Sequence, residues 1–309
     1  MTARGRSQPQ PHPGAGAGVV YATLAFAWWG LFPLYFRIVG TVPVVQILAH
    51  RIVWSLVLLL GLLAARRQWS WLRQVLQEPR VLAAFTASAL LLSVNWLTNL
   101  WAVGNGHVID ASLGYFINPL VSVLLGYTVL HERPRRAQWI ALSLAGLGVV
   151  WLTIAAGRPP WIALVLALSF GAYGLMRKVA VLGPLEGLAL ETILLAPLAG
   201  IALGYWAWQG SGSFPAPDLT TNLWLIGFGP ITAVPLLLFA AGARRLPLAT
   251  LGLLQYIGPT LQFLIGVWVF HEPFTVVRLV GFGCIWLALL LYSVDGWRAS
   301  RRIVVAGPA

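Results

Sequence analysis

The stretch NPLVSVLLGYTVLHE, residues 118–132, carries a frame of residues that the chain uses twice. Pro119 is followed by six residues and then Gly126, and four more residues separate Gly126 from the pair His131 and Glu132. The stretch PTLQFLIGVWVFHE repeats this spacing 140 residues later, with Pro259, Gly266, His271 and Glu272. This recurrence predicts that the chain contains two copies of one structural unit.

The composition indicates a protein that lies in lipid. Only 9% of the residues are charged and 59% are hydrophobic, with a mean hydropathy of +0.81. Because a soluble globular protein carries roughly 25% charged residues, this chain lacks the polar surface that water requires. The single cysteine, Cys284, excludes an internal disulfide and a multi-cysteine metal cluster.

Apolar segments of the length that crosses a bilayer core, ~20 residues, recur along the chain. Ten such segments have the approximate bounds 18–36, 43–64, 81–103, 111–130, 138–156, 161–176, 185–208, 222–242, 248–270 and 276–294. We therefore expect an all-α integral membrane protein with ten transmembrane helices, and nine or eleven are the alternatives. Residues 1–17 lack periodicity and are expected to form a disordered cytoplasmic tail, and residues 295–309 a second cytoplasmic tail.

Further matches extend the repeat over most of the chain. Gly30 corresponds to Gly171 and Pro43 to Pro184, both at an offset of 141 residues. We therefore predict two repeats, residues 18–156 and 161–294, with five helices each. Because five is odd, the second repeat enters the membrane from the opposite side, so the pair forms an inverted repeat.

The cations predict the orientation of the chain. With both termini in the cytoplasm, three cations lie on the outer side (Arg37, Arg158 and Arg278), Arg51 lies within a span, and sixteen lie on the cytoplasmic side. The sixteen are Arg4, Arg6, Arg66, Arg67, Arg73, Arg80, Arg133, Arg135, Arg136, Arg177, Lys178, Arg244, Arg245, Arg298, Arg301 and Arg302. This distribution follows the positive-inside rule. The net charge of +12 is therefore a signal of topology and does not indicate nucleic-acid binding.

Inverted repeats that enclose a site at the middle of the bilayer are characteristic of secondary transporters. We expect alternating access for a small-molecule substrate, driven by an ion gradient or by the substrate's own gradient. A nucleotide-driven pump is excluded, since the only lysine, Lys178, is followed by Val179 and no phosphate-binding loop is present. A passive channel or facilitator remains an alternative, as does an intramembrane lipid-modifying enzyme.

Ionisable residues within spans are costly and mark functional sites. His50 and Arg51 lie seven and eight residues after Pro43, and Glu191 lies seven after Pro184, so His50 and Glu191 are equivalent under the repeat and are expected to meet. One hypothesis is that Glu191 binds a cationic substrate group or a coupling proton, with Arg51 or His50 as its resting partner. The alternative is a structural ion pair between Arg51 and Glu191.

Neutral polar and aromatic residues form a second group of candidates for substrate binding. Trp29 is deep enough to stack on a ligand, and the others are Asn95, Asn99, Tyr115, Asn118, Gln255 and Tyr256. For each of these amides and phenols, the alternative role is hydrogen bonding between helices. Pro119 and Pro259 are expected to break their helices and to free backbone carbonyl groups.

Five stretches together resemble the RarD branch of the EamA family in the drug/metabolite transporter superfamily. They are HRIVWS (50–55), NWLTNLWAV (95–103), ASLGYFINPL (111–120), ETILLAP (191–197) and LGLLQYIGPT (251–260). The resemblance covers about 19–295 and implies ten helices in two inverted units and an inner-membrane transporter of small molecules. Members often carry glycine where His131 and His271 stand here.

The expected partners follow from this interpretation. We expect a small-molecule substrate, the lipid bilayer, and protons as the candidate coupling ion, in a monomer or a homodimer. No cofactor and no metal ion is expected. The substrate and the direction of transport are left open by the sequence.

Overall fold

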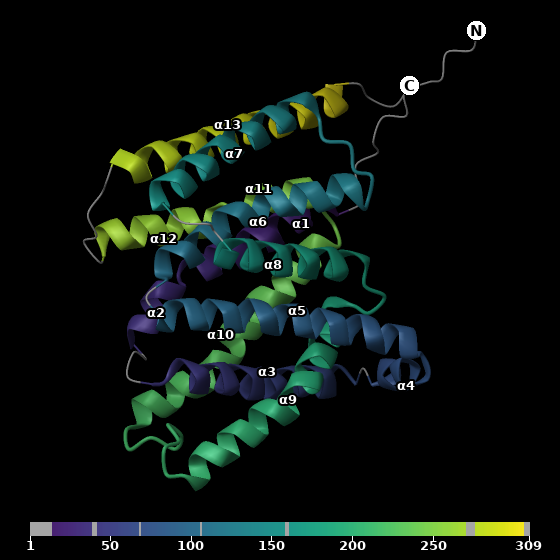
Figure 1. Ribbon diagram of the computed structural model, residues 1–309. Coiled ribbons are helices and arrows are strands. Elements are labelled where there is room, and N and C mark those ends of the chain that lie inside the picture. The colour runs from purple at the N-terminus through teal and green to yellow at the C-terminus, as the bar shows by residue number, and fades with distance from the viewer. Residues whose placement is uncertain are drawn as a thin grey trace.

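The computed structural model describes residues 14–38, 42–67, 69–105, 107–157, 161–269 and 276–305. These residues form helices joined by short connections, and no strand occurs among them (Figure 1). The helices are α1 (Ala15–Gly30), α2 (Phe32–Ile38), α3 (Val44–Arg66), α4 (Ser70–Gln77), α5 (Pro79–Gly104), α6 (Val108–Thr128), α7 (Arg136–Ala156), α8 (Trp161–Val179), α9 (Pro184–Trp208), α10 (Leu219–Ala243), α11 (Leu248–Leu254), α12 (Ile257–Trp268) and α13 (Val276–Val305).

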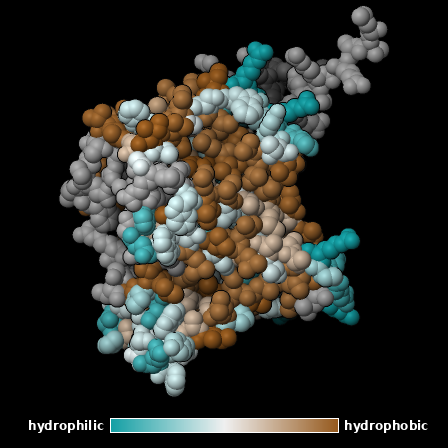
Figure 2. Space-filling view, viewed as in Figure 1, coloured by the Kyte–Doolittle hydropathy of each residue, from teal (hydrophilic) through white to brown (hydrophobic). Residues whose placement is uncertain are grey.

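Seven segments of the described chain are long and apolar enough to span a membrane. They are Ala15–Tyr35, Val44–Arg66, Pro79–Asn99, Arg136–Ala155, Trp161–Val179, Pro184–Trp208 and Leu219–Ala243. The remaining predicted spans, 111–130, 248–270 and 276–294, coincide with α6, with α11 and α12, and with α13, which fall outside these seven. On the face drawn in Figure 2, hydrophobic residues cover the middle of the bundle, and hydrophilic residues gather toward the ends of the helices.

The two prolines of the repeated frame act differently. Pro259 has no N–H to donate to the carbonyl of Gln255, and the chain turns at Gln255 and Tyr256 between α11 and α12. Pro119 lies inside α6, which continues from Val108 to Thr128. The prediction that Pro119 breaks its helix is therefore wrong, because the helix accommodates one missing hydrogen bond without ending.

Glu132, at the end of the repeated frame, caps a helix of the other half. Its carboxylate accepts hydrogen bonds from the backbone N–H groups of Leu248 (2.9 Å) and Ala249 (3.2 Å), at the start of α11. Lys178 Nζ lies 3.6 Å from Glu132 Oε1 and donates to the carbonyl of Leu246. The carboxylate thus satisfies two free N–H groups at the positive end of the helix dipole.

The remaining residues of the first frame position that carboxylate. A Cβ atom at Gly126 would lie 2.7 Å from Glu132 Oε2, so a larger residue there would displace the carboxylate from its present position. His131 has a φ of 53°, in the left-handed region where glycine is favoured. This backbone requirement gives His131 a conformational role in the turn. His271 and Glu272 lie outside the described residues.

Replacing Glu132 with glutamine should lower the free energy of unfolding by about 1 to 2 kcal/mol, because a neutral amide caps α11 less well and leaves Lys178 without its counter-ion. Thermal unfolding of the purified protein in detergent measures this change. Glu78→Gln is the control, since Glu78 is an exposed glutamate at the end of α4. Equal melting temperatures for the two variants would contradict the capping role.

Four helices, α3, α5, α9 and α10, pack together and position the candidate site. Helix α3 contacts both α9 and α10, and α5 contacts α9. Helices α3 and α10 approach closely at Gly229, where an added Cβ would lie 2.5 Å from the carbonyl oxygen of Trp54. Ser55 Oγ donates to the carbonyl of Gly229 at 3.2 Å beside this contact. The close packing leaves little space between the four helices.

Candidate functional site

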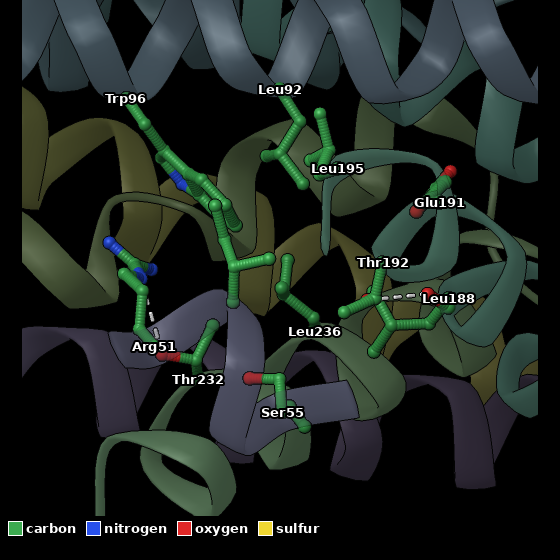
Figure 3. A pocket seen from close by; sticks show the side chains of 12 residues that line it. Arg51, Ser55, Leu92, Trp96, Leu188, Glu191, Thr192, Leu195, Thr232 and Leu236 are labelled. Carbon is green, nitrogen blue, oxygen red and sulfur yellow. Dashed lines mark hydrogen bonds between the residues drawn. The ribbon is translucent and has the colours of Figure 1, made fainter. Parts of the chain in front are cut away.

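A small cavity lies between α3, α5, α9 and α10 (Figure 3). Its volume is about 10 Å³, which is enough for about one water molecule. Charged side chains lie toward opposite ends, Arg51 at one and Glu191 at the other, and leucines fill the space between them in Figure 3. The lining residues are Arg51, Ile52, Ser55, Leu92, Trp96, Leu188, Glu191, Thr192, Leu195, Thr232, Ala233 and Leu236.

At one end, Glu191 is surrounded by donors. Ser88 Oγ donates to Oε1 at 2.5 Å, and Tyr173 OH donates to Oε2 at 3.4 Å. Arg177 Nη1 lies 3.6 Å from Oε1, and the side chains of Arg177 and Glu191 are each only 1% exposed. Glu191 therefore has a buried counter-ion and two hydroxyl donors.

The position of Arg177 depends on a glycine. A Cβ at Gly187 would lie 2.1 Å from Arg177 Nη1, so the guanidinium crosses α9 where that helix has no side chain. Arg177 Nη2 donates to the carbonyl of Pro184 at 3.1 Å, and the guanidinium lies 5.6 Å from the centre of the Phe85 ring. The guanidinium is thus held between α5, α8 and α9.

The structure corrects the predicted partner of Glu191. Its partner is Arg177, so the predicted pairing with Arg51 or His50 is wrong. Arg177 is buried in the last turn of α8. The error arose because Arg177 precedes Lys178 near the end of an apolar run, and its direction depends on how α8 is rotated against α9.

At the other end of the cavity, Arg51 lies on an aromatic ring. Its guanidinium carbon is 4.1 Å from the centre of the Trp96 ring, and Nε donates to Thr232 Oγ1 at 3.2 Å. The Tyr115 side chain lies near Arg51. Tyr115 OH also accepts a hydrogen bond from Asn99 Nδ2 at 3.0 Å. The structure therefore brings together three predicted site residues, Arg51, Asn99 and Tyr115.

His50 lies in a second, larger cavity of about 320 Å³, between α3, α9 and the segment that follows α9. Its ring lies 5.6 Å from Phe214, and neither ring nitrogen has a hydrogen-bond partner among the described residues. The expectation that His50 meets Glu191 is wrong, because adjacent residues of a helix point about 100° apart. Arg51 reaches the first cavity and His50 the second.

Other predicted residues lie at contacts between helices. Asn95 Nδ2 donates to Leu166 O (2.9 Å) and Ser169 Oγ (3.1 Å) on α8. Tyr256 OH donates to Phe116 O at 3.2 Å, and Gln255 Nε2 donates to Ser122 Oγ at 3.3 Å. Both of the latter bonds join the α11–α12 turn to α6. These side chains have the alternative role that the sequence left open, hydrogen bonding between helices.

Trp29 and Asn118 also lie outside the first cavity. The Trp29 ring packs against Phe26, Phe170 and Phe239, at centroid distances of 5.7 to 5.8 Å. Asn118 is buried in α6, and its Oδ1 has no hydrogen-bond partner among the described residues. Trp29 therefore belongs to an aromatic cluster of α1, α8 and α10.

Sequence reasoning missed Ser88, Tyr173 and Arg177. Tyr173 and Arg177 are four residues apart in α8 and so share one helix face, a spacing that marks them as a polar pair within an apolar run. Ser88 is one of several serines in its span, and its spacing gives no signal. No three His, Cys, Asp or Glu side chains come together as metal ligands in the part of the chain that is described.

Comparison with known proteins places this chain in a family. The model of the EamA-like transporter family matches residues 16–154 and again residues 159–294. The chain belongs to the EamA-like transporter family. It is thus a multi-pass membrane protein of a transporter family, and the resemblance to RarD-type proteins is confirmed.

Relatives cover almost the whole EamA chain. "Protein RarD" of Streptomyces exfoliatus is 47% identical over 288 residues, covering 92% of this chain and 90% of that protein. "Uncharacterized transporter YojE" of Bacillus subtilis is 46% identical over 292 residues, covering 92% and 96%. A solved structure, "Crystal structure of protein", has a TM-score of 0.69 at 18% identity and covers 90% and 98%, which shows a shared fold.

Proposed function

We propose that this EamA protein is a secondary transporter that moves small molecules across the cytoplasmic membrane by alternating access. The observation that carries the proposal is the cavity between α3, α5, α9 and α10, which holds charged residues but has room for only about one water molecule. A substrate enters such a cavity only if the helices around it move apart. That requirement favours a gated site over a permanently open channel.

The pattern of helix contacts supports an inverted repeat around this cavity. Under the repeat offset, α3 corresponds to α9, α5 to α10, and α1 to α8. The contact of α3 with α10 then mirrors that of α9 with α5, and the contact of α1 with α10 mirrors that of α8 with α5. The two matches of one family model to successive halves of the chain also support it. Two repeats in opposite orientations would expose one site to each side in turn.

The Glu132 cap gives a place where one side would open. It joins the segment after α6, in the first half, to Lys178 and the start of α11, in the second half. Under the orientation that the arginines predict, with both termini in the cytoplasm, this contact lies on the cytoplasmic side. Opening toward the cytoplasm would require this contact to separate. The driving force would be an ion gradient, with protons as one candidate, or the substrate's own gradient.

Two-sided accessibility of the cavity tests the proposal. We would replace Cys284 with alanine, introduce Ser55→Cys in the cavity, and treat oriented vesicles with a membrane-impermeant maleimide from either side. We expect Ser55→Cys to be labelled from both sides, and each labelling to be slower than that of an exposed loop cysteine. Two controls are Arg67→Cys at the exposed end of α3, expected to react only from the cytoplasm, and Leu90→Cys on the exposed apolar face of α5, expected to react from neither side.

The possible results separate the function classes. Labelling of Ser55→Cys from one side only contradicts alternating access. Labelling of Ser55→Cys from both sides at the rate of an exposed loop cysteine indicates a channel. Proteoliposome counterflow of a bound compound would then measure transport directly, whereas turnover of a lipid without vesicle asymmetry would indicate an enzyme.

A further inference from the structure

We propose that the substrate of this transporter is an organic carboxylate whose acid group binds the guanidinium of Arg51. This inference rests on the proposed transport function and names the substrate class of the same cavity. It replaces the hypothesis of a cationic substrate at Glu191, because Glu191 already has Arg177 as its counter-ion.

The balance of charge around the cavity leaves Arg51 unmatched. Three ion pairs form among the described residues, Arg177 with Glu191, Lys178 with Glu132, and Arg135 with Asp295. Arg51 takes part in none of them. A cation in an apolar bundle is costly without a counter-ion, so an anion is the missing partner. A cationic ligand would meet a Glu191 that is already neutralised by Arg177.

The geometry of Arg51 suits a carboxylate. Trp96 covers one face of the guanidinium, and Thr232 accepts the Nε–H. This arrangement fixes the plane of the group and leaves the terminal N–H groups to bind a ligand at the edge. A held guanidinium edge matches the two oxygens of a carboxylate in a bidentate pair. Arg51 is the sole cation lining the cavity, which favours a singly charged carboxylate over a doubly charged phosphate.

The neighbouring residues describe the rest of the ligand. The hydrogen-bonded pair Asn99 and Tyr115 lies near Arg51, and Tyr115 is 38% exposed. Toward Glu191, the cavity is lined by apolar side chains including Leu92, Leu195 and Leu236 (Figure 3). A ligand with its acid group at Arg51 would place an apolar or aromatic body against these leucines once the helices separate.

Binding of four ring compounds of similar size tests the charge preference. The purified protein would be titrated with benzoate, phenyl phosphate, benzamide and benzylamine, with the melting temperature and the Kd as measurements. We expect benzoate to stabilise the protein and to bind at least about tenfold more tightly than benzamide or benzylamine, since the charged pair is lost in the other two.

Variants assign the preference to Arg51. Arg51→Gln should weaken benzoate binding by about 30-fold or more, as expected for truncating one side of a desolvated charge pair. Arg51→Lys keeps the charge without the planar edge and should weaken binding by about tenfold, which keeps the test valid if the glutamine variant does not fold. Arg66→Gln, an exposed arginine at the end of the same helix, is the matched control and should bind as the wild type does.

Several results would overturn the inference. They are a preference for benzylamine or benzamide, a response to phenyl phosphate but not to benzoate, no response to benzoate at millimolar concentration, and benzoate binding that survives both Arg51 variants. The labelling of Ser55→Cys does not depend on Arg51 or on any ligand. Two-sided labelling together with no carboxylate preference would therefore reject this inference alone, and one-sided labelling would reject the transport proposal.

Discussion

Replacing Glu191 with glutamine is expected to lower the free energy of unfolding by about 3 to 5 kcal/mol, because it leaves Arg177 charged and buried without a counter-ion. Both side chains are 1% exposed, so water cannot screen the remaining charge. The two hydroxyl donors, Ser88 and Tyr173, would also lose a charged acceptor. At about 2 to 4 °C per kcal/mol, the melting temperature should fall by about 10 °C.

A double variant distinguishes a structural pair from a ligand site. Buried ion pairs replaced on both sides by apolar residues of similar volume are often as stable as the original pair. Arg177→Met combined with Glu191→Met should therefore recover most of the stability that either single change loses. A Glu191→Gln protein that melts as the wild type does would show that the ion pair contributes little to stability. That result would favour a role for Glu191 in binding the substrate or a proton.

Replacing Gly229 with alanine is expected to separate α3 from α10 and to cost about 3 kcal/mol of stability, near the upper end of the range for overpacking. The added Cβ would lie 2.5 Å from the carbonyl oxygen and 2.6 Å from the carbonyl carbon of Trp54, and backbone atoms cannot rotate out of the way. Pro230 adds to the strain, since its ring conflicts with a Cβ on the preceding helical residue. Because both helices line the cavity, binding at Arg51 should weaken as well.

The matched control for Gly229 is another helical glycine, Gly200 in α9. No atom of the described chain lies within 4 Å of a Cβ built at Gly200. Alanine there should leave the melting temperature unchanged or raise it, because alanine is the better helix former by up to about 1 kcal/mol. A loss of stability at Gly200 equal to that at Gly229 would contradict the steric explanation, and unfolding in detergent with a graded denaturant measures both.

The arrangement around Glu191 shows where prediction from sequence ended. The location of Glu191 within a helical span was predicted from the sequence, because Glu191 stands inside an apolar run. Its partner did not follow, because Arg51, His50 and Arg177 all lie within about one or two turns of a helix end. Which of them points at Glu191 depends on the rotation and tilt of α3 and α8 against α9.

The repeated frame shows the same division. The sequence predicted a span over residues 111–130, which ends just before Glu132. The structure shows that Glu132 caps α11, more than 100 residues away in sequence, and that Gly126 makes room for the carboxylate. A helix cap supplied from a distant segment leaves no local pattern in the sequence, because its acceptor and its donors lie in different segments of the chain.

The sequence by itself determined that this protein lies in a membrane, that it is helical, and where most of its helices begin and end, because hydrophobicity and breaks in helices are properties of local residues. The family also followed from sequence stretches alone. Only the tertiary structure decided that Arg177 neutralises Glu191, that His50 and Arg51 face different cavities, and that Arg51 has no counter-ion among the described residues. These outcomes depend on distances between helices, and packing of whole helix faces sets those distances.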